Sequence, residues 1–349
     1  MISDRLSDYA FDFPKELIAS RSPGKGKTQI LHCPKDGKGP LEIVPAPRIV
    51  EFFRPGDCIV VNNTKVIPAR LFGRTLHGGQ VEILLVQTLF PDEAGNARWE
   101  AWVRPGKAFP VGRELEIAGI KTHVEQINPD GARVLRFEAT PVELEKVMNE
   151  QGHVPLPPYI ARPDDEEDKK AYQTIFAKYN GAVAAPTASL HFNSQMLEDL
   201  KAKGVKIAEV TLHVGPGTFQ NIATENFREH KMHGEHYELT QENADIINGA
   251  RQNGGRIVPI GTTSTRVIET IAQEDGTLSA QTGVTHAFFY PGYRYKIADG
   301  LLTNFHWPKS SLILLVAAFY GRENTLAAYK YAVEHRLHLF SYGDGMLIL

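Results

Sequence analysis

The feature that most constrains the fold is a change in the period of the hydrophobic pattern near Pro141. Before this point, from Val66 to about Ala139, β-branched and aromatic residues form short runs separated by Gly, Pro and Asn-Pro-Asp-Gly turn signals. Roughly five or six closely spaced strands with no helical period between them predict a small antiparallel β-barrel.

After Pro141, helical and strand-like segments alternate, which predicts a layered α/β domain. The expected helices cover 142–151, 166–178, 194–203 and 241–252, and the expected strands cover 205–210 and 256–260. A further strand candidate, 57–61, precedes the barrel and belongs with the α/β part. The barrel is therefore an inserted domain. The predicted boundaries are 1–65 with 141–349 for the α/β domain and 66–140 for the barrel.

Composition and charge narrow the classes of protein. The chain has 349 residues, of which 42% are apolar, so it has enough apolar residues for a normal core. The 38 basic and 41 acidic residues give a net charge of -3, so an RNA partner would need a local basic patch. One candidate patch near the start consists of Lys25, Lys27, Lys35, Lys38 and Arg54.

Cysteine usage and hydropathy predict a cytoplasmic protein that does not enter a membrane. Cys33 and Cys58 are too few for a disulfide scaffold or a four-thiolate zinc site. No secretory signal is visible at the start. The apolar run 310–321 is shorter than the roughly 18 to 20 residues that span a bilayer.

Two segments imitate known motifs but have the wrong spacing. The run 23–28 ends like a phosphate-binding P-loop, yet Arg21 stands where the first glycine is required. The cluster 230–236 is rich in His and Glu, but Lys231 occupies the position of the catalytic Glu of a zinc protease. We therefore expect no metal site.

Other segments place polar residues at the ends of apolar runs. In 257–266 a strand leads into Gly261 and four hydroxyl residues that open a helix, so free N–H groups could bind a carboxylate or phosphate. The alternative is a helix start with more capping residues than it needs. In 185–192 and 211–219 small residues flank His191 and His213, which could serve as general acids or bases or could be structural.

Two segments near the end contain further polar and aromatic side chains that could contact a ligand. In 302–311 the His, Asn, Lys and aromatic residues could stack on a base and hydrogen-bond to it. In 340–346 the carboxylate of Asp344 stands between two glycines, which a simple core strand would not need.

In combination these motifs resemble the S-adenosylmethionine:tRNA ribosyltransferase-isomerase family of the queuosine pathway. The resemblance runs in order from Leu6 to Leu349 and also includes Gly56-Asp57, 62–70 and 152–160. Its main segments are 181–192, 211–219, 230–235, 261–266, 303–311 and 341–346.

The resemblance implies an α/β domain carrying an inserted barrel, and an enzyme with S-adenosylmethionine as co-substrate and no metal. The ribosyl part of this donor would pass to the aminomethyl group of a 7-deazaguanine at the tRNA wobble position. Adenine and methionine would leave and epoxyqueuosine would remain. The partner would be the anticodon stem-loop of tRNA, and the protein is expected to be a monomer.

Within that framework each candidate residue has an expected role. The acid/base candidates are His191, His213 and His306. The methionine carboxylate is expected at Gly261, Thr262, Thr263 and Ser264, with Arg266 as a charged partner. Glu235 and Asp344 could bind the ammonium, the ribose hydroxyls or the acceptor amine, or form structural salt bridges. Substrate contacts are expected from Thr187, Phe192, Asn304 and Lys309.

The chain also departs from the family pattern. Ser189 stands where Gly is usual, Asn63 and Lys65 where Asp and Arg are usual, and His338 where Arg is usual, and a Ser-Arg-Leu-Leu run near residue 28 is missing. Because Lys lacks the planar fork of Arg, these changes bear on the acceptor. Two alternatives stay open: a non-catalytic RNA-binding relative, and a methyltransferase that would produce S-adenosylhomocysteine.

Overall fold

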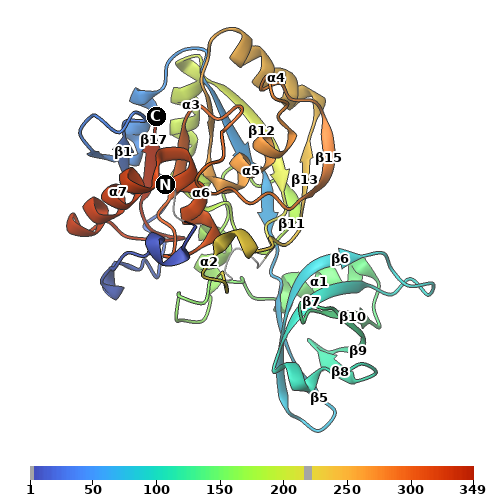
Figure 1. Ribbon diagram of the computed structural model, residues 1–349. Coiled ribbons are helices and arrows are strands. Elements are labelled where there is room, and N and C mark those ends of the chain that lie inside the picture. The colour runs from blue at the N-terminus through green and yellow to red at the C-terminus, as the bar shows by residue number, and fades with distance from the viewer. Residues whose placement is uncertain (1–3, 216–221) are drawn as a thin grey trace.

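The computed structural model describes residues 4–215 and 222–349. The predicted motif 211–219 is thus described only as far as Gly215, and its residues 216–219 lie outside the described residues. The chain forms a larger α/β body and a smaller barrel, which lies at the lower right of Figure 1. The fold class predicted from the sequence is confirmed.

The first sheet of the α/β body has the strand order β14-β3-β12-β13-β15. Its strands are β3 (Cys58–Asn62), β12 (Lys206–Leu212), β13 (Glu235–Leu239), β14 (Ile257–Pro259) and β15 (Gln281–Thr285). The first three strands in this order are parallel and the last two pair antiparallel. All five residues of β3 are buried, as expected for a strand with both faces covered.

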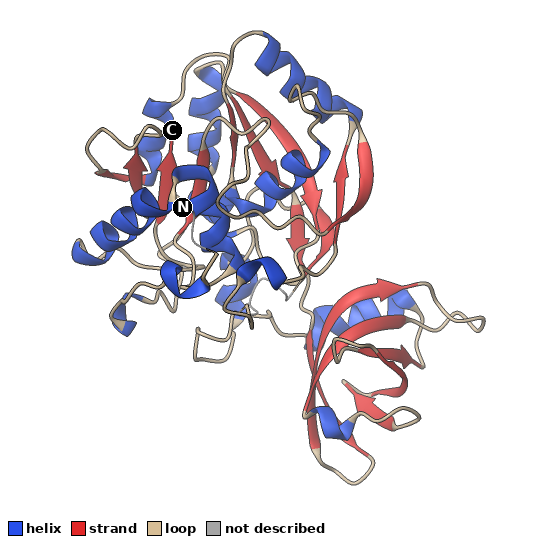
Figure 2. Cartoon of the chain, in the orientation of Figure 1, coloured by secondary structure: helices blue, strands red, loops and turns tan. Residues whose placement is uncertain are grey.

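Helices cover this sheet on both faces, as Figure 2 shows. Ile59 and Val61 of β3 share a hydrophobic cluster with α3 (Ser194–Ala202). Cys58 and Val60 share another with α4 (Gln241–Gln252) and α5 (Gly261–Ile271). Alternate residues of one strand therefore hold the two helical layers.

The second sheet has the order β16-β17-β1-β2. Its strands are β1 (Gln29–Cys33), β2 (Glu42–Pro45), β16 (Leu301–Asn304) and β17 (Gly345–Ile348). A parallel bridge between Ile260 and Leu302 links this sheet to the end of β14. A short parallel pair, β4 (Thr64–Val66) with β11 (Tyr179–Ala182), leads towards the barrel.

The remaining helical segments begin at polar caps or form short connections. Ser310 caps α6 (Ser311–Tyr320), which α7 (Arg322–Glu334) follows. The 3-10 segments are η1 (Leu6–Tyr9), η2 (Lys15–Leu17), η3 (Ala46–Phe52), η4 (Gly106–Ala108), η5 (Thr187–His191) and η7 (Phe227–Glu229).

The helix predicted over 166–178 is shorter in the structure, where α2 covers Glu166–Ala171. Tyr172 and Phe176 are both buried but pack into different hydrophobic clusters, so no single helix face serves both. The hydroxyl of Thr174 accepts a hydrogen bond from the N–H of Phe176, which favours a turn at this point.

The barrel is closed, with the order β10-β7-β6-β5-β8-β9. Its strands are β5 (Arg70–Thr75), β6 (Gln80–Leu89), β7 (Arg98–Arg104), β8 (Glu114–Ile117), β9 (Ile120–Ile127) and β10 (Arg133–Phe137). Helix α1 (Pro141–Gln151) adds Leu144 and Met148 to the barrel core, although it lies beyond the predicted boundary at residue 140. The exact boundaries stay a prediction.

Two hydrogen bonds pair the chain entering the barrel with the chain leaving it. The N–H of His153 donates to the carbonyl of Arg70, and the N–H of Arg70 donates to the carbonyl of His153. We call this pairing the neck. In the described part of the chain, no helix is both long enough and apolar enough to cross a membrane.

Candidate active site

A cavity of about 390 Å³ lies in the α/β body and falls within the usual size range of small-molecule sites. Its walls come from the start of α5, from η5, from the segment after β16 and from two loops. The lining residues are 158–159, Tyr172, 184–188, Val214, 261–263, 303–307, Ser310, Leu312 and 340–341.

The topology explains why distant segments meet at this cavity. Ile260 and Leu302 are paired in parallel, so the chains that follow them leave the sheets side by side. In sheets with parallel strands, ligands bind at the carboxyl ends of the strands. Gly261 and Thr303 each come just after this pairing, and both line the cavity.

The amino end of α5 lacks a side-chain cap and opens onto the cavity. Gly261 takes φ +90°, which favours glycine, and lets the chain turn from strand to helix. The hydroxyls of Ser264 and Thr265 donate back to the carbonyls of Ile260 and Gly261 at 3.0 and 2.9 Å. Neither hydroxyl is a cap, so the free N–H groups of the first turn can bind an anion.

Thr263 adds a side-chain donor at the same place. It lines the cavity, it is only 8% exposed, and its hydroxyl has no hydrogen-bond partner among the described residues. A buried hydroxyl without a partner costs free energy, so it is a natural contact for a bound ligand.

His306 is the one of the three candidate histidines that lines the cavity. Its Nε2 shares a hydrogen bond of 2.7 Å with the hydroxyl of Thr303, and its backbone N–H donates to the hydroxyl of Tyr329 at 3.0 Å. Burial lowers the pKa of His306 to about 3. The imidazole is therefore neutral at pH 7.

His191 lies behind the cavity wall. Its Nδ1 shares a hydrogen bond of 2.8 Å with the hydroxyl of Thr28, and it is almost fully buried. Burial lowers its pKa to about 4, although an interaction with Asn304 opposes the shift. A Cβ at Gly345 would lie 2.7 Å from Nε2 of His191, so this close contact requires glycine.

Asn304 lines the cavity, and its side chain also interacts with His191. Its Nδ2 donates to the carbonyl of Phe340 at 2.9 Å, whereas its buried Oδ1 has no geometrically satisfactory hydrogen bond within the described chain. The Asn304 side chain is therefore fixed by Phe340 at its amide nitrogen, and its amide also interacts with the His191 ring behind the cavity.

His213 is held away from the cavity. Its neighbour Val214 lines the cavity, and successive residues of an extended chain point to opposite sides. The Nδ1 of His213 shares a hydrogen bond of 2.9 Å with the hydroxyl of Thr64. Burial, followed by the charge of His236, lowers its pKa.

Arg266 and Glu235 form a buried ion pair outside the cavity lining. The Nε of Arg266 also donates to the carbonyl of Ala287 at 3.2 Å, and Oε1 of Glu235 accepts from the N–H of Gly215 at 3.1 Å. The guanidinium expected beside a ligand carboxylate is thus already paired with a carboxylate of the protein.

Of the other predicted site residues, some line the cavity and some do not. Thr187 lines the cavity, whereas Phe192 is a core residue that packs against Phe176 with ring centroids 5.8 Å apart.

Asp344 is buried, which raises its pKa, and it accepts from the N–H groups of Gln29 and His338 at 2.7 Å each. Lys309 is exposed, with φ +58°, between the lining residues Trp307 and Ser310.

Sequence reasoning did not assign Tyr159, Tyr172, Phe340 or Ser341 to the site, yet all four line the cavity. Tyr159 belongs to a Pro-rich segment without periodicity, and only its place in the resemblance motif 152–160 marked it. The hydroxyl of Tyr159 shares a hydrogen bond of 2.5 Å with that of Ser341, so two of these residues are joined.

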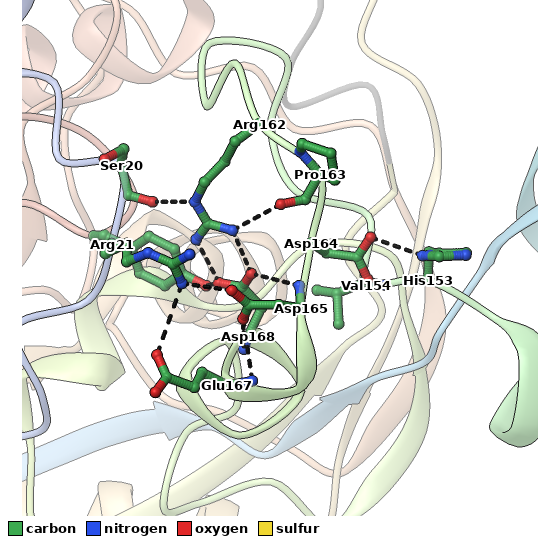
Figure 3. A network of polar contacts seen from close by, with 11 residues as sticks. Ser20, Arg21, His153, Val154, Arg162, Pro163, Asp164, Asp165, Glu167 and Asp168 are labelled. Carbon is green, nitrogen blue, oxygen red and sulfur yellow. Dashed lines mark hydrogen bonds and ion pairs between the residues drawn. The ribbon is translucent and has the colours of Figure 1, made fainter.

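A network of ion pairs and hydrogen bonds holds the segment 153–168 (Figure 3). We call this segment, to which Tyr159 belongs, the strap. Arg162 makes a two-pronged contact with Asp168 at 2.6 and 2.7 Å and also donates to the carbonyl of Ser20. Asp164 accepts from the ring of His153 and the N–H of Val154, both at 2.8 Å. Both ends of the strap are therefore fixed.

Among the described residues that line the cavity there is no Asp, Glu, Lys or Arg, so these residues offer a ligand neutral groups and helix N–H groups. Over residues 4–215 and 222–349, no group of three or more His, Cys, Asp and Glu side chains is placed to hold a metal ion.

The fold and the cavity together define the class: an α/β protein with an inserted barrel and an uncharged cavity suited to a small organic ligand with an anionic group. The chain belongs to the family described as queuosine biosynthesis protein, whose sequence profile matches residues 6–348. The family resemblance seen in the motifs is thereby confirmed.

Individual relatives cover almost the whole chain. A protein of Clostridium kluyveri named S-adenosylmethionine:tRNA ribosyltransferase-isomerase is 44% identical over 349 residues, which span 98% of this chain and 99% of that protein. A protein of the same name from Acetivibrio thermocellus is 44% identical over 347 residues, with 99% of each chain covered. The crystal structure of S-adenosylmethionine tRNA ribosyltransferase from Thermotoga maritima matches with a TM-score of 0.56 and 33% identity, covering 98% of this chain and 100% of that one.

Proposed function

We propose that this chain transfers and isomerises the ribosyl part of S-adenosylmethionine onto the 7-aminomethyl-7-deazaguanine at the tRNA wobble position. Epoxyqueuosine would remain in the tRNA, and adenine and methionine would leave. The observation that carries the proposal is the uncapped start of α5, with the unpartnered hydroxyl of Thr263, in the same cavity as a neutral histidine.

The start of α5 binds the methionine carboxylate in this proposal. The N–H groups of Gly261, Thr262 and Thr263 lie at the positive end of the helix dipole, and the Thr263 hydroxyl adds a donor. Arg266 and Ser264 act indirectly, because Arg266 is paired with Glu235 and Ser264 donates to a backbone carbonyl. Asp344 holds the turn before β17 through its two backbone hydrogen bonds.

His306 acts as the proton-transfer group between the carbon beside the sulfonium and the departing adenine. The sulfonium of the donor acidifies the C–H groups beside it, and the unprotonated imidazole of His306 accepts the proton from that carbon, although burial makes it a weak base. The low pKa of His306 makes its protonated form a strong acid, which suits delivery of the proton to the departing adenine. Thr303 fixes the ring through Nε2, which leaves Nδ1 for this exchange. His191 and His213 support the site from outside the cavity.

The acceptor enters as a base flipped out of the anticodon loop. The Asn304 amide, which lines the cavity, accepts a hydrogen bond from the aminomethyl group and orients its nitrogen for attack on the ribose. Lys309 is exposed next to the lining residue Ser310 and contacts a phosphate, as do Lys25 and Lys27. We also propose a monomer in the cytoplasm, where the buried thiols of Cys33 and Cys58 stay reduced.

One assay tests the reaction. The protein is incubated with S-adenosylmethionine and an anticodon stem-loop that carries the precursor base, and adenine release is measured. We expect stoichiometric release of adenine and methionine. RNA binding without adenine would favour the non-catalytic relative, and S-adenosylhomocysteine would show methyl transfer instead.

A pair of variants tests the carboxylate site. Thr263→Val should weaken S-adenosylmethionine binding about tenfold in isothermal titration, because it removes a hydrogen bond to a charged group. Thr265→Val removes a hydroxyl from the same helix turn that does not line the cavity, so its affinity should stay within about twofold. Equal effects of the two variants would reject the assignment.

A further inference from the structure

Three aromatic rings form one wall of the cavity: Tyr159, Trp307 and Phe340. Tyr159 and Trp307 lie nearly parallel, with ring centroids 5.6 Å apart and an interplanar angle of 12°. Phe340 closes the group at 5.2 Å from Tyr159 and 4.7 Å from Trp307. We call these three residues the aromatic wall.

A cationic ligand has no carboxylate to pair with among the described lining residues of this cavity, because none of them is acidic. The buried carboxylates nearby in the chain are already engaged. Asp168 is bound by Arg162 and by the hydroxyl of Tyr342, and Asp344 is bound by two backbone N–H groups. Within the described lining, a positive charge can therefore be stabilised only by neutral groups, and the faces of aromatic rings are one such group.

We propose that the aromatic wall binds the sulfonium cation of the donor through cation–π interactions. The inference rests on the proposed function, because that function supplies a ligand with a trialkylsulfonium group. In S-adenosylmethionine three carbon atoms separate the carboxylate from the sulfur. The segment bearing Trp307 leaves its strand beside the start of α5, which places a ring face and the carboxylate site in one cavity.

The strap positions this wall. Tyr159 lies between the two anchored parts of the strap, and its hydroxyl is fixed by Ser341. From the other side Phe13 packs edge-on against Trp307 and Phe340 at 5.5 and 5.1 Å but does not line the cavity. The rings are thus held in place before a ligand arrives, which lowers the entropic cost of binding.

The test compares a charged and a neutral ligand. Binding of S-adenosylmethionine and S-adenosylhomocysteine is measured by isothermal titration at pH 7 for the wild type and three variants. The two ligands share the carboxylate and the adenine but differ in the sulfonium charge. Trp307→Leu should lower the ratio of the two affinities about thirtyfold, the size of a desolvated cation–π contact.

Two variants provide matched controls. Trp307→Phe keeps an aromatic face, so the ratio should stay within about threefold of the wild type. Phe13→Leu loosens the packing behind the wall without removing a face, so it should leave the ratio unchanged. Circular dichroism melting of each variant establishes that it is folded.

The outcomes separate the two proposals. If Trp307→Leu weakens both ligands equally, the ring stacks on the shared adenine and the sulfonium assignment is overturned. If neither affinity changes, the wall does not contact the donor and the assignment is likewise overturned. A wild-type protein that binds neither ligand would instead reject the proposed function itself.

Discussion

The ion pair between Arg162 and Asp168 gives the sharpest stability prediction. The Asp168 side chain is only 3% exposed. Burial alone would raise its pKa, but hydrogen bonds from Arg162, Tyr342 and Asp165 outweigh it and lower the pKa from 3.8 to about 2. At about 1.4 kcal/mol for each pH unit, this lowering stabilises the folded state by about 2 kcal/mol at pH 7.

The direction of the pH dependence follows from how strongly each state of the protein binds the proton of Asp168. The folded state binds the proton of Asp168 more weakly than the unfolded state does, so the stabilisation is complete above pH 3.8 and is lost as the pH falls towards 2. Asp168→Asn should therefore lower the free energy of unfolding by about 2 kcal/mol at pH 7 and by about 1 kcal/mol at pH 3.

Urea unfolding followed by circular dichroism measures both values. Glu167→Gln is the control, because Glu167 is 86% exposed and lies 3.7 Å from Arg21, so its loss should cost less than about 0.5 kcal/mol. A loss for Asp168→Asn that is the same at both pH values would refute the linkage argument.

Three further results are expected. His306→Gln should reduce adenine release at least about a hundredfold while the Kd for S-adenosylmethionine changes less than threefold, in single-turnover and titration experiments. Gly345→Ala should destabilise the protein by about 1 to 3 kcal/mol in urea unfolding, because its Cβ would meet Nε2 of His191 at 2.7 Å; an unchanged midpoint would contradict this packing. Raising salt from 50 to 200 mM should weaken stem-loop binding and spare S-adenosylmethionine; a flat RNA response would argue against phosphate contacts.

The barrel and the α/β alternation could be predicted because both depend on local periodicity. Short β-branched runs between Val66 and Ala139 indicate closely spaced strands, and the structure has strands β5 to β10 in this range. The helix predicted to continue from Ala171 to Lys178 failed because two buried aromatics serve different clusters. Which cluster a side chain joins depends on contacts between distant segments, and local patterns do not record them.

The candidate site was predictable as a set of segments but not residue by residue. A single step along the chain separates Val214, which lines the cavity, from His213, which does not. The pairing of Arg266 with Glu235 depends on how β13 lies beside α5, and the sequence contains no local signal for it. Motifs therefore located the cavity, whereas packing decided which motif residues face it.

The neck affects how the inserted barrel can change in evolution. Directly paired residues in an antiparallel ladder lie about 5 Å apart, so the two points where Arg70 and His153 meet are nearly adjacent. Segments between them that do not contact the α/β body could be lengthened or trimmed while the rest of the chain keeps its shape, whereas Gln87 is held by a 3.0 Å hydrogen bond to His236. We therefore expect insertions and deletions in the barrel to be tolerated best away from the residues that contact the α/β body.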